Sequence, residues 1–222
     1  MPESILVIAP HPDDEALGCG GTLCLHHHRG DTIHIIFLTS GDDGIQGTPA
    51  AQTRAIREAE AAASAFILSA ATVDFLRLPD RSVSDHLPAG AAALRPLILA
   101  YRPNVIYLPH PDESHPDHAA AVPVVRAALA PDFPLHPDHT HLRVYEVWTP
   151  MLKPGWVEDI APVMATKLRA LRCHRSQLRA LRYDRAILAL NRYRGLMLGG
   201  TRYAEAFAYL PLNPAVPAGV SA

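Results

Sequence analysis

The sequence predicts an α/β fold with a Rossmann-like, mostly parallel, twisted sheet flanked by helices. Short apolar runs alternate along the chain with longer segments of helical composition, as in domains built around a parallel sheet. Histidines and carboxylates follow directly after several of these runs, where open α/β sheets bind their ligands. With a strand order of 3-2-1-4-5, the first and fourth strands are neighbours, and we expect the site at their C-terminal ends.

Composition narrows the class of protein further. The 222 residues are 49% hydrophobic and 19% charged, which is typical of one globular domain with a well-buried core. A formal net charge of −2 gives no general attraction for nucleic acid or an anionic membrane, so we expect neither as a partner. We expect a single domain over residues 1–210 and a Pro/Ala-rich tail over 211–222.

The sequence also bears on the protein's location. No apolar run reaches membrane-spanning length, and we expect no secretory signal before the first strand. The three cysteines do not show CxxC spacing, and we expect them to be reduced thiols. Reduced thiols favour a cytoplasmic protein. The oligomeric state stays open, with a homo-oligomer among the alternatives.

The first strand, residues 5–9, ends in the motif His11-Pro12-Asp13-Asp14-Glu15. The imidazole of His11 and the carboxylate of Asp14 are ligands that suit zinc, which leaves Asp13 and Glu15 for acid–base chemistry. Acidic residues in a first helical turn also stabilise the helix dipole, but that role does not explain the histidine. We therefore expect half of a metal site here.

A helix over residues 15–29 follows the motif, with Gly30 as its C-cap. Its glycines, Gly18, Gly20 and Gly21, each cost about 1 kcal/mol relative to alanine in a helix. We expect them where the helix approaches the sheet closely or where the metal needs space.

The next elements bring more polar residues to the same sheet edge. The second strand, residues 32–38, ends in a Gly/Asp turn in which Asp42 serves either the turn or a wall of the site. The following helix, residues 51–68, carries Arg57, which read alone forms an exposed ion pair worth about 0.3–0.5 kcal/mol. The third strand, residues 73–78, places Asp80 just past its end.

The fourth strand, residues 105–108, follows a helix over 89–101 and leads into a second motif. This motif, His115-Pro-Asp117-His118, offers a third metal ligand and a charged pair, and it opens a helix over residues 119–130. The same four letters recur at residues 136–139, within a proline-rich connection. Because rigid elements hold ligands better than such loops, we assign the site to the first copy.

The C-terminal third is predicted to contain a strand over residues 142–147 and one long helix over 162–181. Trp148 follows the strand and serves either the core or a sugar ring. Arginines spaced three or four apart, from Arg169 to Arg185, form a stripe beside the leucines of this region, which indicates a solvated face, with a site for an anionic partner as the alternative.

Together the two motifs resemble the PIG-L/LmbE family of zinc-dependent N-acetylglucosaminyl deacetylases, which carry both after the corresponding strands. Weaker similarity continues to His174-Arg-Ser176-Gln177 and to a closing strand around residues 203–207. The resemblance implies removal of an N-acetyl group from an amino sugar or its conjugate. It also implies that Arg57, Asp80 and Asp42 help bind this small-molecule substrate.

The residue types suggest a mechanism. His11, Asp14 and His118 leave a fourth position on one Zn²⁺ per chain, or on another divalent transition metal, for water. Asp13 is then free to take the proton of that water as general base and to pass it to the leaving amine. We expect His115, held protonated by Asp117, to act as acid or to stabilise the oxyanion. We expect Asp112 to orient one of the histidines from behind.

Two other functions remain open from the sequence. One is a metal-dependent hydrolase of another amide or of an ester. The other is a non-catalytic sugar-binding protein, against which the free carboxylate of Asp13 argues. No Gly-x-Gly-x-x-Gly turn follows the first strand, so a dinucleotide cofactor is not expected.

Overall fold

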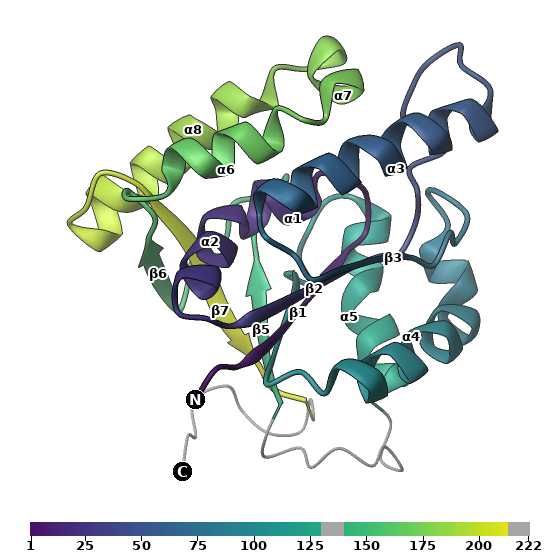
Figure 1. Ribbon diagram of the computed structural model, residues 1–222, viewed down its shortest axis with the longest axis horizontal. Coiled ribbons are helices and arrows are strands. Elements are labelled where there is room, and N and C mark those ends of the chain that lie inside the picture. The colour runs from purple at the N-terminus through teal and green to yellow at the C-terminus, as the bar shows by residue number, and fades with distance from the viewer. Residues whose placement is uncertain (130–139, 213–222) are drawn as a thin grey trace.

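The structure is a computed structural model that describes residues 1–129 and 140–212. One sheet of seven strands, in the order β3-β2-β1-β4-β5-β7-β6, runs through its centre (Figure 1). The neighbouring strands β3, β2, β1, β4 and β5 are parallel to one another, and β7 is antiparallel to both of its neighbours, β5 and β6. The strands are β1 Ser4–Ala9, β2 Thr32–Phe37, β3 Thr72–Phe75, β4 Val105–Pro109, β5 His141–Tyr145, β6 Trp156–Asp159 and β7 Ala204–Leu210. The predicted fold class and the neighbouring positions of the first and fourth strands are confirmed.

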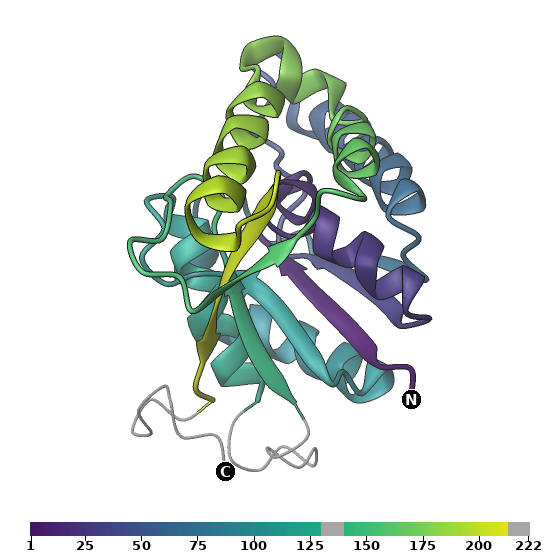
Figure 2. The same cartoon turned by 90° about the vertical axis from the view of Figure 1, so that its left-hand side faces the viewer.

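Helices cover both faces of the sheet (Figures 1 and 2). They are α1 Asp14–Gly18, α2 Gly20–His28, α3 Ala50–Ile67, η1 Val83–His86, α4 Leu87–Tyr101, α5 Pro116–Ala128, α6 Met164–Leu171, α7 Arg175–Ala180, α8 Tyr183–Arg194 and the π-helical turn η3 Gly195–Gly199. Alternate residues of β1 point to opposite faces, so Ile5 and Val7 pack with α1, α2 and α3 while Leu6 and Ile8 pack with α4 and α5. None of the helices in the described ranges is both long and apolar enough to cross a membrane.

The helix expected over residues 15–29 is divided at Cys19, whose φ of −134° is not helical. The second piece, α2, starts where the buried carboxylate of Glu205 accepts the backbone N–H groups of Gly21 and Thr22, both at 2.8 Å. Lys167 donates to the same carboxylate at 2.6 Å and balances its charge. A distant acidic side chain on β7 therefore caps this helix, which local sequence patterns do not reveal.

Two of the predicted close approaches are present. A Cβ atom on Gly18 would lie 2.1 Å from the ring of Tyr145, which belongs to β5. A Cβ atom on Gly21 would lie 2.7 Å from Ile160. These two glycines allow α1 and α2 to pack against the sheet and the segment that follows β6.

The C-terminal third departs from the sequence prediction. The expected helix over residues 162–181 is two helices, α6 and α7, and the sequence analysis missed α8 and β6. The arginine series from Arg169 to Arg185 is therefore spread over three helices. The second His-Pro-Asp-His copy and most of the expected tail lie outside the described residues, so both assignments remain predictions.

Candidate metal centre and catalytic pocket

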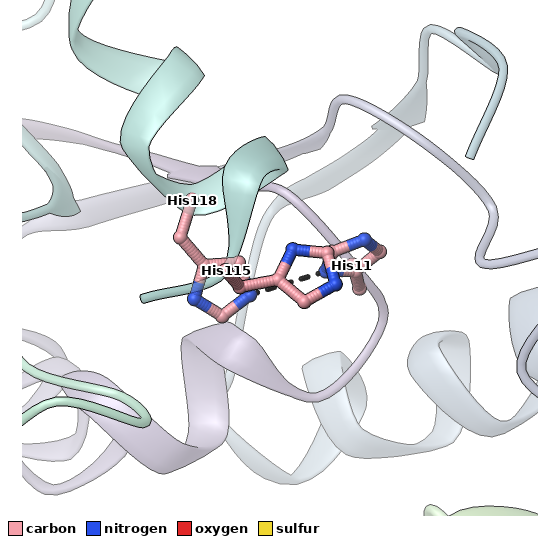
Figure 3. A group of neighbouring side chains, drawn as sticks. All are labelled: His11, His115 and His118. Atoms are coloured by element: carbon pink, nitrogen blue, oxygen red, sulfur yellow. Dashed lines mark hydrogen bonds between the residues drawn. The ribbon is translucent and has the colours of Figure 1, made fainter. Parts of the chain in front are cut away.

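The two motifs meet at the C-terminal edge of the sheet. His11 lies on the loop after β1, while His115 and His118 lie at the start of α5, after β4 (Figure 3). Parallel pairing of β1 with β4, with Ile5 opposite Val105, brings the two loops together. In Figure 3 the three imidazole rings turn toward one another.

Three ligand atoms form a nearly equilateral triangle. Nδ1 of His11 lies 3.3 Å from Oδ2 of Asp14 and 3.2 Å from Nε2 of His118, and the last two atoms are also 3.2 Å apart. Ligand atoms about 2.0–2.1 Å from a tetrahedral Zn²⁺ are separated by about 3.3 Å, so the triangle has the size of one face of such a site. The donor set therefore fits one divalent ion.

The far sides of both imidazoles face carboxylates. Nε2 of His11 lies 3.0 Å from Oδ2 of Asp117 and 3.1 Å from Oδ1 of Asp80. Nδ1 of His118 has no hydrogen bond within the described residues, and its nearest carboxylate oxygen is Oε2 of Glu113 at 3.6 Å. Such contacts favour a proton on the outward nitrogen of each ring and leave the inward nitrogen free to bind a metal.

The carboxylates around His11 and His118 favour a positive charge within the cluster. Burial lowers the pKa of His118, but Asp14 and Glu113 outweigh burial and raise it to about 9. Burial also lowers the pKa of His11, yet its hydrogen bonds to Asp117, Asp14 and Asp80 raise it well above the ordinary value. The carboxylates thus favour a cation in their midst, which either protonated imidazoles or a divalent metal ion can supply.

Asp13 is held apart from the triangle in an unusual backbone conformation. Its φ is 121°, a region that non-glycine residues rarely adopt. Its backbone N–H donates to Oε2 of Glu15 at 3.0 Å, and its Oδ2 accepts the hydroxyl of Tyr183 at 2.7 Å. Burial raises the pKa of the Asp13 carboxyl, and Arg57, 3.5 Å away, opposes that rise. Backbone strain of this kind is often found at functional sites.

Glu15, the third acid of the first motif, is fully buried and supports Asp13 from behind. Its Oε1 accepts the hydroxyl of Ser64 at 2.8 Å and faces Nε2 of His174 at 3.3 Å. Glu15 does not line the pocket, whereas Asp13 does.

The expected pairing of Asp117 with His115 is wrong. The carboxylate of Asp117 instead contacts His11 and accepts the backbone N–H groups of Arg81 and Val83 at 2.7 and 3.0 Å. Nδ1 of His115 accepts the backbone N–H of Asp117 at 3.2 Å, because His115 occupies the N-cap of α5. Burial lowers the pKa of His115, and the neighbouring His11 and His118 lower it further. The lowered pKa favours the neutral ring, and because Nδ1 accepts a hydrogen bond, the proton of that neutral ring lies on Nε2.

The expected supporting role of Asp112 is also wrong. Asp112 is exposed, whereas its neighbour Glu113 is buried beside His118. The carboxylate of Glu113 accepts the backbone N–H groups of three consecutive residues, Val147, Trp148 and Thr149, at 2.6, 3.1 and 3.1 Å. Glu113 thus joins a ligand histidine to the loop that carries Trp148. The sequence offered no signal for choosing between the adjacent acids.

The three residues expected to bind substrate, Arg57, Asp80 and Asp42, differ from one another in their surroundings. Arg57 is buried, lines the pocket and donates to the carbonyl oxygens of Pro12 and Gly41 at 2.7 and 3.2 Å, so the exposed ion pair considered for it is excluded. Asp80 lines the pocket while it contacts His11. Asp42 is paired with Arg54 and does not line the pocket, whereas the neighbouring Asp43 lines it.

One pocket of about 590 Å³ is lined by several of the residues described above, namely His11, Asp13, Asp14, Asp43, Arg57, Asp80 and His115. Its wall also includes two residues from the C-terminal third, Trp148 and Tyr183, whose rings meet edge to face at 5.8 Å between centroids. The sequence analysis missed Tyr183, because α8 itself was not predicted. The remaining wall is formed mainly by Gly44, Gln46, Arg81, Gln177, Ala180 and Leu181.

Known proteins are similar to this chain in both sequence and fold. Residues 6–129 match the family described as PIG-L: GlcNAc-PI de-N-acetylase. The diacetylchitobiose deacetylase of Thermococcus kodakarensis is 31% identical over 94% of this chain and 84% of its own length. A probable N-acetyl-alpha-D-glucosaminyl L-malate deacetylase 2 of Bacillus anthracis is 27% identical over 78% of this chain and 80% of its own length.

A solved structure extends the comparison to three dimensions. The N,N'-diacetylchitobiose deacetylase of Pyrococcus horikoshii superposes with a TM-score of 0.81 at 26% identity, covering 94% of this chain and 84% of that one. The similarity thus includes α6 to α8, which lie beyond the region matched by the family.

Proposed function

The chain belongs to the PIG-L family, and from that premise we propose that it hydrolyses the N-acetyl group of an N-acetylglucosamine-type amino sugar or its conjugate. The observation that supports this proposal most directly is the triangle of His11, Asp14 and His118 beside the separately held carboxylate of Asp13. A binding protein has no need of such a carboxylate, whereas hydrolysis requires a base next to the metal.

We propose that His11, Asp14 and His118 hold one divalent ion, with zinc as the first choice for two imidazoles and a carboxylate. When bound, such an ion lowers the pKa of water to about 7 and polarises an acyl oxygen. Asp80, Asp117 and Glu113 keep the two ligand imidazoles in the orientation that binding requires.

Asp13 is the proposed general base. Its Oδ2 is occupied by Tyr183, whereas its Oδ1 accepts no hydrogen bond within the described residues and lies in a residue that lines the pocket. Oδ1 is therefore the atom proposed to take a proton from the attacking water and to deliver it to the amine as the C–N bond breaks. The products are acetate and the free amino sugar.

His115 is proposed as a neutral hydrogen-bond donor to the acyl oxygen. Its Nδ1 is occupied by the backbone of α5, which leaves Nε2–H for the pocket that the residue lines. A donor fixed at a helix start stabilises developing negative charge without reorganising during the reaction. Arg57 and Asp80 are proposed to complete the polar wall around the sugar.

Acetate release tests this function. Purified protein loaded with zinc is incubated with N-acetylglucosamine, N,N'-diacetylchitobiose and simple acetyl esters, and acetate is quantified. We expect acetate from the amino sugars and little from the esters. Equal or faster release from the esters would point instead to a metal-dependent hydrolase of another class, and binding without release would point to a non-catalytic sugar-binding protein.

A further inference from the structure

Arg81 occupies a distinctive position at the pocket. It follows Asp80 on the loop between β3 and η1, and it is an exposed residue of the pocket wall. Its φ of 61° lies in the left-handed region, where glycine or asparagine is usually found. Arg81 thus carries a long cationic side chain in a backbone conformation that disfavours such a residue. Strain of this kind is often found at functional sites, so the side chain is a candidate for a functional contact.

The backbone of Arg81 is tied to the proposed metal centre. Its N–H donates to Oδ2 of Asp117 at 2.7 Å and approaches Oδ1 of Asp80 at 3.1 Å. Both carboxylates also contact Nε2 of His11. The position of the Arg81 backbone is therefore fixed relative to His11, so its side chain starts from a defined point of the pocket wall.

The guanidinium of Arg81 has no carboxylate partner in the part of the chain that the structure describes. Nearby arginines differ. Arg57 is buried and donates to two carbonyl oxygens, Arg54 is paired with Asp42, and Arg77 is paired with Glu58 at 2.9 Å. Arg81 is thus an exposed cation of the pocket wall that has no carboxylate partner among the described residues.

From these observations we propose that Arg81 forms a subsite for an anionic substituent, a carboxylate or a phosphate, on the N-acetylglucosamine-type substrate. The inference rests on the proposed deacetylase function and adds the charge class of its substrate. A planar guanidinium binds either anion through two parallel hydrogen bonds. Asp43, whose backbone N–H donates to Asp80, lines the same pocket and can accept hydrogen bonds from sugar hydroxyl groups.

Matched substrates test the proposal. The carboxymethyl glycoside of N-acetylglucosamine is compared with its uncharged carbamoylmethyl counterpart, and N-acetylglucosamine 1-phosphate is compared with the methyl glycoside. We expect the zinc-loaded protein to show a kcat/KM about 10-fold higher for at least one anionic substrate than for its neutral partner, as one charge-assisted contact provides. The pair that shows the preference identifies the anion as a carboxylate or a phosphate. Added salt should reduce the preference, mainly through KM.

Two variants that each remove one positive charge test whether Arg81 causes the preference for anionic substrates. Arg81→Gln should lower the anionic-to-neutral ratio of kcat/KM about 10-fold, whereas Arg185→Gln, on α8 outside the pocket, should not change the ratio. Arg81→Gly keeps the backbone N–H and suits the positive φ, so it should lower the ratio equally while the protein remains folded.

The outcomes separate this inference from the function on which it rests. If no substrate in the panel releases acetate, the proposed function itself is wrong. If neutral and anionic substrates are hydrolysed equally well, or if Arg81→Gln and Arg81→Gly lower both alike, the deacetylase function stands and the anionic subsite is rejected.

Discussion

Nδ1 of His11 lies 3.2 Å from Nε2 of His118, although 107 positions separate the two residues in the sequence. Pairing of β1 with β4 brings them together, and Asp14 completes the triangle. The proposed metal site therefore does not exist in the unfolded chain, and we expect metal binding to be coupled to folding.

We expect the metal content of the protein to depend on the triangle of His11, Asp14 and His118. We expect about one zinc per chain by elemental analysis, and removal of the metal with a chelator should lower Tm because the ion binds only the folded state. His118→Ala should lose most of its metal, whereas His139→Ala, in the second His-Pro-Asp-His copy, should retain it. Metal retained by His118→Ala and lost by His139→Ala would reverse the assignment between the two copies.

Asp13→Asn should separate metal binding from catalysis. The substitution preserves the size of the side chain and removes the base, so turnover should fall about 10²–10⁴-fold while the metal content is unchanged. Acetate release and elemental analysis of the same preparation provide both measurements. Loss of metal in this variant would mean that Asp13 is a ligand or holds one in place.

Glu113→Gln tests the support behind His118. The carboxylate faces Nδ1 of His118 and accepts three backbone N–H groups, so its replacement should weaken metal affinity about 10–100-fold. Competition with a chromophoric chelator measures that affinity. The exposed neighbour supplies the control, because Asp112→Asn should leave the affinity unchanged. Equal effects of the two substitutions would contradict the role of Glu113.

Two adjacent glycines should respond in opposite directions to alanine. At Gly21 the new Cβ atom would lie 2.7 Å from Ile160, so Gly21→Ala should destabilise the protein by about 1–3 kcal/mol. At Gly20 the nearest atom is 3.5 Å away, so Gly20→Ala should stabilise it by about 0.4–1 kcal/mol through a less flexible unfolded chain. Urea unfolding measures both, and destabilisation by Gly20→Ala would show that its site is tighter than described.

The pair of Asp184 with Arg182 should make a pH-dependent contribution to stability. Hydrogen bonds from Arg182, with two nitrogens at 2.9 Å, lower the pKa of Asp184 in the folded state below its ordinary value. A lowered folded pKa means that the pair stabilises above pH about 4 and that this contribution is lost as the pH falls further. Asp184→Asn should therefore cost about 0.5–1 kcal/mol at pH 7, because the arginine is half-exposed, and less at pH 3. A cost that is equal at both pH values in urea unfolding would exclude this ionic contribution.

The fold class and the sheet edge that carries the candidate site can both be predicted from the sequence. Strands and helices differ in the spacing of their apolar residues, and this local property can be read along the chain. The polar motifs after residues 5–9 and 105–108 stand at strand ends, so a parallel sheet must bring them to one edge once the two strands are neighbours. His11, Asp14 and His118 are proposed as metal ligands on this basis, because their residue types suit a metal and their positions converge.

The pairs of side chains that face one another could not be predicted in the same way, because they depend on how the elements pack. Asp117 contacts His11 rather than His115, and Glu113 rather than Asp112 stands behind His118. Tyr183, from a helix that the sequence did not reveal, donates to Asp13. A contact of 3–4 Å depends on the direction of each side chain after the elements have packed. Adjacent acids such as Asp112 and Glu113 look alike in the sequence and differ only in the side of the chain on which they lie.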